Sequence, residues 1–155
     1  MHGKPLLIGV IGASSASSKG LENAYQVGRL IAEAGAALVC GGLGGIMEAA
    51  SQGAAEAGGE VIGILPGPSA QDANAYVSIP VVTDMGHARN IIIAHTANAL
   101  IAIEGEYGTL SEMAISLKLE KKVFVLDSWD NLVGGTTVES PVEAVAMALK
   151  AAGEI

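Results

Sequence analysis

Near the start of the chain, Leu6-Leu7-Ile8-Gly9-Val10-Ile11 is followed by Gly12-Ala13-Ser14-Ser15, and this stretch decides the fold. The apolar run, rich in β-branched residues, is typical of a buried strand. The Gly/Ser-rich segment 12–20 predicts a loop, and 21–34 repeats apolar residues with the period of an amphipathic helix. A strand, a glycine loop and a helix in this order predict the first unit of a parallel sheet with crossover helices.

The same unit recurs along the chain. Further strands are predicted at 37–40, 60–64, 99–103 and 123–126, and further helices at 46–57, 85–96, 110–119 and 141–152. Ser140, Pro141 and Glu143 mark the start of the last helix as N-cap, N1 proline and N3 glutamate. We therefore predict one α/β domain over residues 1–155, Rossmann-like and doubly wound, with a mostly parallel sheet. The first strand and the strand 99–103 are expected to be neighbours at its centre.

Residues 65–80 interrupt this pattern. The segment holds prolines at 66, 68 and 80 with polar residues between them, so we predict a long surface loop. Loops of this length within compact domains are often lids or binding loops, and this one is a candidate to close over a ligand.

The composition excludes several classes of protein. Half of the 155 residues are apolar and 15% are charged, which indicates a folded domain rather than a disordered chain. The net charge of −8 argues against nucleic acid as a partner, because binding to phosphate backbones needs clustered cations. The apolar runs 6–13 and 91–103 are interrupted by glycine or polar residues, and we expect neither a signal peptide nor a membrane span. The single cysteine, Cys40, is expected to fill the core of a cytoplasmic protein.

Three glycine-rich turns follow predicted strands and precede predicted helices. Backbone N–H groups at helix N-termini bind anions, and glycine allows a ligand to approach the backbone closely. The alternative is that these turns are tight connections packed for their own sake. Their convergence at one edge of a parallel sheet favours a phosphate-binding site. The candidate ligand-binding residues in these turns are Gly12, Ser14, Ser15, Gly42, Gly44, Gly45, Gly105, Gly108 and Thr109.

Other site chemistries lack their motifs. The first turn has no G-x-G-x-x-G spacing, and the second strand ends at Cys40-Gly41 without an acidic residue to hold a ribose, which argues against a dinucleotide dehydrogenase. The P-loop motif is also missing. The histidines at 2, 87 and 95 lack metal-ligand spacing, so no metal site is predicted.

Arg89 and Glu112 are the two ionisable residues singled out by their position. Arg89 lies at the start of an apolar helix, and Glu112 follows Gly108-Thr109 in the first turn of the next one. Each has a structural alternative. Thr109 and Glu112 fit a capping box, and Arg89 could pair with Asp84 on the surface.

The segment Gly105-Glu106-Tyr107-Gly108-Thr109-Leu110-Ser111-Glu112 resembles the P-G-G-x-G-T-x-x-E motif of the Lonely-guy family of phosphoribohydrolases. The turn 41–47 is similar to the G-G-G-x-x-G-L-M loop of that lysine-decarboxylase-like superfamily, and Arg89-Asn90 falls where the family carries Arg-Lys. The segment 8–12 and the form Glu-Tyr-Gly-Thr-Leu-Ser-Glu resemble the molybdenum cofactor carrier branch more closely.

The resemblance implies two different functions. In the enzyme branch, an Arg and a Glu, here Arg89 and Glu112, would be catalytic residues acting on the N-glycosidic bond of a nucleoside monophosphate. Three departures lower the expectation of hydrolysis: Glu104 replaces the motif proline, Glu106 replaces its second glycine, and Asn90 replaces lysine. The leading hypothesis is a carrier for a small phosphate-bearing heterocycle, of the molybdenum cofactor or nucleotide type, with Arg89 binding phosphate.

A third hypothesis is an oligomeric scaffold without a ligand. The helix 85–96 carries more apolar residues than one buried face needs. We therefore expect it to pack against another copy, in a homodimer or homotetramer.

Overall fold

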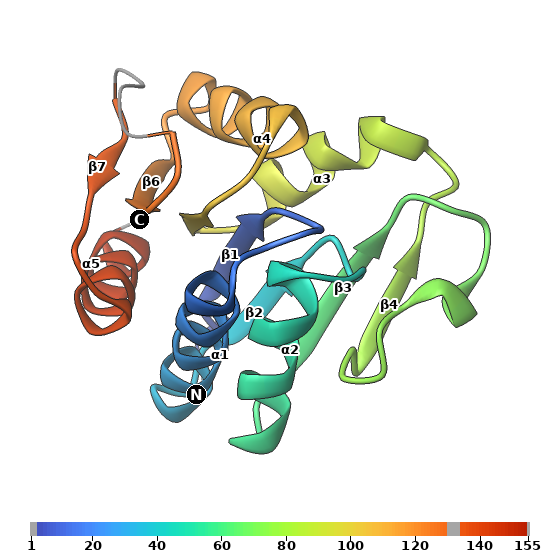
Figure 1. Ribbon diagram of the computed structural model, residues 1–155, viewed down its shortest axis with the longest axis horizontal. Helices are drawn as coiled ribbons and strands as arrows, with labels where there is room; N and C mark the ends of the chain where they lie inside the picture. The colour runs from blue at the N-terminus through green and yellow to red at the C-terminus, as the bar shows by residue number, and fades with distance from the viewer. Residues whose placement is uncertain (1–2, 130–133, 155) are drawn as a thin grey trace.

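The computed structural model describes residues 3–129 and 134–154, and its central feature is a parallel sheet of seven strands in the order β4-β3-β2-β1-β5-β6-β7 (Figure 1). Every neighbouring pair of strands is parallel, and β1 lies between β2 and β5 as predicted. The strands are β1 (Leu7–Gly12), β2 (Ala37–Cys40), β3 (Val61–Leu65), β4 (Ile79–Val82), β5 (Ala99–Ile103), β6 (Lys122–Leu126) and β7 (Thr136–Thr137). The predicted Rossmann-like, doubly wound fold is confirmed.

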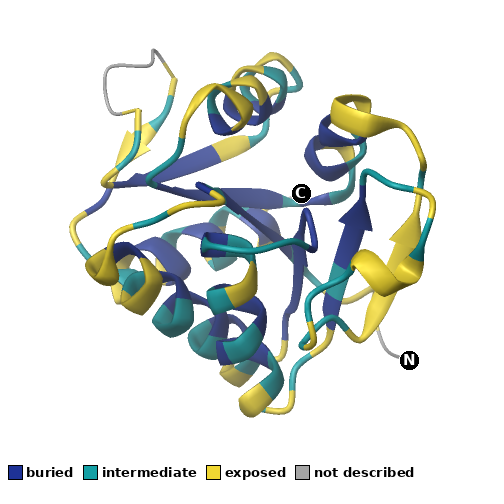
Figure 2. Ribbon diagram, turned by 45° about the vertical axis from the view of Figure 1, so that its right-hand side comes forward, coloured by how far each residue is buried: buried dark blue, intermediate teal, exposed yellow. Residues whose placement is uncertain are grey.

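Helices cover both faces of this sheet, so its central strands are buried from both sides, whereas the edge strands β4 and β7 are exposed (Figure 2). On one face, Val27 and Ile31 belong to the core cluster of Ile8 and Val10. On the other, the core includes Ile93 and Met113 together with Ile11 and Leu100. The first face is covered by α1 (Ser18–Glu33), α2 (Ile46–Glu56) and α5 (Pro141–Gly153), and the second by α3 (Arg89–Thr96) and α4 (Tyr107–Lys118).

The segment 65–80 is not one continuous loop, so this prediction was wrong at its end. It contains the short 3-10 helix η1 (Ala70–Asp72) and the start of β4, which pairs with β3. Pro80 is tolerated in β4 because β4 is an edge strand. On its open side no neighbouring strand needs a hydrogen bond from the N–H that proline lacks. The following helix begins at Arg89, after the 3-10 helix η2 (Gly86–Ala88), rather than at residue 85.

Helix starts show where local sequence is informative. The predicted start of α5 is confirmed, since the Ser140 hydroxyl accepts from the Glu143 N–H and Pro141 is the first helical residue. In contrast, α1 begins at Ser18 with Ser17 as its N-cap, and α4 begins at Tyr107 rather than at Leu110.

The parallel sheet places the carboxyl ends of its strands at one edge, and the three glycine turns follow β1, β2 and β5 there. Helices within the described residues are all too short or too polar to cross a membrane.

Candidate functional site

Arg89 is a buried cation at the carboxyl edge of the sheet. Its side chain is only 8% exposed, and its Nε donates to the carbonyl oxygen of Ile64, at the end of β3, over 2.9 Å. Its terminal nitrogens donate to the Asn90 side-chain oxygen and, over 3.5 Å, to the carbonyl of Gly41 after β2. These acceptors are neutral, and burial lowers the Arg89 pKa from its usual value. The expected alternative, a surface pair with Asp84, is wrong.

Glu112 on α4 is the carboxyl group whose charge acts on this cation. It is 9% exposed, and burial raises its pKa to about 7, although the charge of Arg89 acts in the opposite direction. Within the described residues, no carboxylate comes within ion-pair distance of Arg89. Near neutral pH the site therefore carries a full buried positive charge and only part of one negative charge.

The predicted capping box of Thr109 and Glu112 is wrong. Helix α4 starts after Glu106, so Thr109 is already inside its first turn and is itself buried. Glu112 is one turn further along, and its burial has no capping explanation. The pattern T-x-x-E at 109–112 fits a capping box. The helix begins two residues earlier, at Tyr107, so Thr109 is not its N-cap.

The three helices that follow the glycine turns differ in how their first N–H groups are satisfied. In α1 the Ser17 hydroxyl accepts from the Gly20 N–H. Helices α2 and α4 start after Gly45 and Glu106, and neither has a side-chain cap, although the first N–H of α2, that of Ile46, donates to the Ala13 carbonyl over 2.9 Å. Their N-termini at the carboxyl edge of the sheet are therefore the two that favour an external anion.

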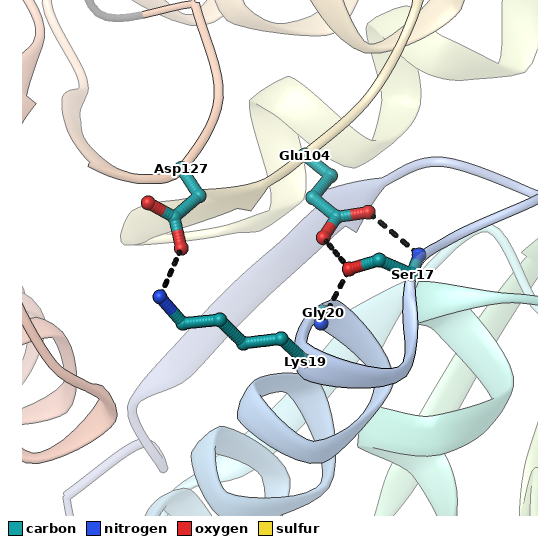
Figure 3. Close-up of polar contacts among 5 residues, drawn as sticks. All are labelled: Ser17, Lys19, Gly20, Glu104 and Asp127. Carbon is teal, nitrogen blue, oxygen red and sulfur yellow. Dashed lines mark hydrogen bonds and ion pairs between the residues drawn. The ribbon is translucent and has the colours of Figure 1, made fainter.

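Glu104 fills the place of an anion at the start of α1 (Figure 3). Its carboxylate accepts from the Ser17 N–H over 3.0 Å and from the Ser17 hydroxyl over 2.5 Å. A Cβ at Gly20 would lie 2.2 Å from that carboxylate, so a side chain there would displace Glu104 from this contact. An exposed ion pair of Lys19 and Asp127, 3.6 Å apart, lies beside this contact. The turn after β5 is thus tied to the start of α1, a role for Ser17 and Glu104 that the sequence alone did not reveal.

Glu104 also adopts a backbone conformation that proline cannot. Its φ is +52°, whereas the proline ring fixes φ near −65°. The turn after β5 therefore differs in conformation from one with the proline of the P-G-G motif at this position.

The predicted glycines fall into two groups. A Cβ at Gly12 would lie 2.3 Å from the Ile103 carbonyl, and one at Gly42 would lie 2.6 Å from the Leu65 side chain. Gly45 and Gly105 have φ values of +66° and +120°, and a Cβ would collide with the Ala13 carbonyl at 2.3 Å and with Thr109 at 2.4 Å. These four glycines are required by the fold itself.

Gly44 and Gly108 are different. A Cβ at Gly108 would meet nothing within 4 Å, and one at Gly44 would meet only the Glu48 carboxylate at 4.0 Å. A ligand that approaches the N-termini of α2 and α4 requires open space beside the backbone, and these two positions have it.

Ser14 and Ser15 lie in a second region of the same edge. Together with Gly45 they line a groove of about 600 Å³ between α1 and α2, which also contains the acidic residues Glu22 and Glu48. Arg89 and Glu112 belong to α3 and α4, which cover the other face of the sheet. The structure therefore brings Arg89 close to Gly41 and within electrostatic range of Glu112, but it groups the two serines elsewhere.

Comparisons with known proteins agree with the fold. A family model described as the SLOG cluster4 family matches residues 5–152. A protein of Archaeoglobus fulgidus is 48% identical over 142 residues, which cover 92% of this chain and 93% of that protein. The structure of the molybdenum cofactor binding protein from the phototrophic bacterium Rippkaea orientalis has 37% identity and a TM-score of 0.90, over 95% of this chain and 97% of that one. The molybdenum cofactor carrier protein of Chlamydomonas reinhardtii has 31% identity and a TM-score of 0.87, over 97% and 99%.

Proposed function

The chain belongs to the SLOG cluster4 family, and on this basis we propose that it binds and carries a small phosphate-bearing heterocycle of the molybdenum cofactor type. Two structures that it resembles along almost their whole length are described as a molybdenum cofactor binding protein and a molybdenum cofactor carrier protein. The same hydrogen-bond donors also suit the phosphate of a nucleotide.

The observation that carries the proposal is the buried guanidinium of Arg89, which has no carboxylate within ion-pair distance among residues 3–129 and 134–154. A buried charge is unfavourable unless an opposite charge compensates it. Three neutral acceptors hold the Arg89 side chain in place, and one N–H on each terminal nitrogen remains beyond these bonds. A phosphate supplies the missing negative charge, and the uncapped N-termini of α2 and α4 add further donors.

Phosphoribohydrolase activity is the second candidate, and one observation favours it. A carboxyl group with a pKa of about 7 is suited to general acid or base catalysis near neutral pH, and the charge of Arg89 acts on Glu112. The backbone of Glu104 and the carboxylate of Glu106 count against this candidate, because both depart from the P-G-G motif of the enzymes. We therefore place the carrier first.

One experiment separates the two candidates. The protein is mixed with AMP and GMP, binding is measured by calorimetry, and free base and ribose 5-phosphate are measured by chromatography. We expect binding without turnover. Turnover that disappears in Glu112→Gln contradicts the carrier and supports the hydrolase. The third hypothesis, an oligomeric scaffold without a ligand, is favoured if no phosphate-bearing probe binds or shifts the melting temperature of the protein.

A further inference from the structure

Asn90, the second residue of α3, is a buried amide beside Arg89. It is 3% exposed, so it is enclosed even more fully than the arginine. A terminal nitrogen of Arg89, Nη1, donates to the Asn90 side-chain oxygen. Because a guanidinium has only donors, the oxygen of the amide is the atom that has to point toward it. The contact therefore fixes which end of the Asn90 amide meets Arg89.

The other end of this amide is its Nδ2 group, which carries two N–H donors. Among residues 3–129 and 134–154, Nδ2 donates to no acceptor. No fully buried side-chain nitrogen or oxygen in this part of the chain lacks a partner, so Nδ2 is not sealed from a ligand. The Asn90 amide thus holds Arg89 with one end and offers donors to an anion with the other.

The amide is neutral, which decides how much charge Arg89 keeps. The other acceptors of the guanidinium are backbone carbonyls, which are neutral as well. Two titratable groups act on it through space, Glu112 and the thiol of Cys40. Burial raises the pKa of the Cys40 thiol, so the thiol stays neutral, and the pKa of Glu112 is about 7. Most of the positive charge of Arg89 is therefore left for a ligand.

Other residue types at position 90 would change this balance. Lysine, which the Lonely-guy motif has here, carries no acceptor, so it cannot hold the guanidinium and would add a second cation. Aspartate would hold Arg89 in the same way, but its carboxylate would compensate the buried charge from within the protein. Of these three residues, asparagine alone accepts from the guanidinium and leaves its charge intact.

We infer that Asn90 positions Arg89 for an external anion and, by being neutral, keeps the charge of the guanidinium available to that anion. The inference rests on the proposed function, because it concerns the same phosphate. The Oδ1 atom orients the guanidinium, and Nδ2 donates to the phosphate beside it. Asn90 is thus a positioning residue that makes the site selective for a negatively charged group.

The test compares Asn90→Asp with Asn90→Ala. Aspartate keeps the shape of the side chain and adds a negative charge, whereas alanine removes both polar atoms without adding charge. Binding of AMP and GMP is measured by calorimetry. We expect Asn90→Asp to weaken both nucleotides at least tenfold and Asn90→Ala to weaken them about threefold. Gln71→Glu adds the same charge at an exposed position on η1 and is expected to leave both affinities unchanged.

Two further measurements separate charge from structural damage. Asn90→Asp is expected to melt no lower than Asn90→Ala, because the buried guanidinium gains an opposite charge. The charge of Arg89 lowers the pKa of Glu112, so its compensation by aspartate is expected to raise that pKa above 7. Carbon-13 NMR of the Glu112 carboxyl group follows this titration. Asn90→Ala is expected to leave the pKa near 7.

The outcomes distinguish this inference from the proposed function. If the wild type binds AMP or GMP and Asn90→Asp binds as well as Asn90→Ala, the inference is contradicted and the phosphate site stands. An Asn90→Asp variant that is unfolded, or that melts below Asn90→Ala, also contradicts it, since the carboxylate then fails to compensate Arg89. If the wild type binds neither AMP, GMP nor inorganic phosphate, the proposed function fails and the inference with it.

Discussion

At the scale of single residues, we propose that the buried Arg89 guanidinium is the group that binds the anion. Its guanidinium is held by backbone carbonyls of two strand ends, so its position is fixed before any ligand arrives. We expect Arg89→Ala to weaken GMP binding at least tenfold in calorimetry, because a charge-assisted contact to phosphate is lost. The matched control is Arg29→Ala, since Arg29 is the other arginine of the chain and pairs with Glu33 on the outer surface of α1. Equal losses in both variants would contradict a specific role for Arg89.

Glu112 makes the stability of the protein depend on pH. Burial raises its pKa from 4.5 to about 7 in the folded state, so the protonated form favours folding. This contribution is complete below pH 4.5 and is lost as the pH rises through 7. Each pKa unit corresponds to about 1.4 kcal/mol, so the ionised carboxylate destabilises the fold by on the order of 3 kcal/mol.

The variant Glu112→Gln tests this pH dependence, because glutamine imitates the protonated side chain. We expect little change in the free energy of unfolding at pH 5 and a gain at pH 8, measured by urea denaturation. If Glu112→Gln is less stable than the wild type at pH 8, the attraction of Arg89 for the ionised carboxylate outweighs the cost of burying that charge.

The sequence singled out Arg89 and Glu112 from their positions, but not their burial. Burial depends on contacts with Ile64 and Gly41, which are distant in the chain. Ser17 and Glu104 were not recognised as a contact for the same reason, since 87 residues separate them. The serines at 14, 15, 17 and 18 offer several possible caps, and the tertiary contact with Glu104 selects Ser17.

At the scale of elements, two glycines near the start of α4 have different roles: Gly105 is required by the fold, and the backbone at Gly108 is open to a ligand. A side chain at Gly108 has open space, so Gly108→Val is expected to leave the fold largely intact and to abolish ligand binding by blocking approach to the backbone. Gly105→Val is the control for structural damage, because residue 105 has a φ of +120° and its Cβ would collide with Thr109. Circular dichroism and calorimetry measure the two effects. Undiminished binding by Gly108→Val would place the ligand elsewhere.

The elements differ in how well their sequences predict them. The central strands β1 and β5 are continuous apolar runs, which indicate a sheet buried on both faces, and they were predicted closely. The edge strand β4 was missed because Pro80 suggested a loop, and its pairing with β3 depends on the sheet rather than on local sequence. The two-residue β7 is too short to give a local signal.

At the scale of the whole molecule, apolar side chains gather at the β4 edge and around α3. Ile79, Val82, Met85 and Ile91 are each about half exposed, with values between 45% and 51%. Exposed apolar side chains near an open sheet edge favour association. We continue to expect a homodimer or homotetramer that buries this surface.

A charge on this surface tests the assembly. Ile91→Glu is expected to convert the oligomer to a monomer in light scattering at micromolar concentration. Val142→Glu is the control, since Val142 on α5 is 67% exposed and belongs to the opposite face of the sheet. A wild-type protein that is monomeric under the same conditions would contradict the expectation.

The central claim is that the molecule carries a phosphate-bearing heterocycle beside Arg89, and native mass spectrometry of the purified protein tests it most directly. The wild-type protein is predicted to retain a bound molecule whose released mass and fragments identify a phosphorylated pterin or nucleotide. Arg89→Ala is predicted to lose this molecule, whereas Arg29→Ala retains it. A wild-type protein that carries no such molecule, and gains none when incubated with GMP or neopterin monophosphate, would contradict the account.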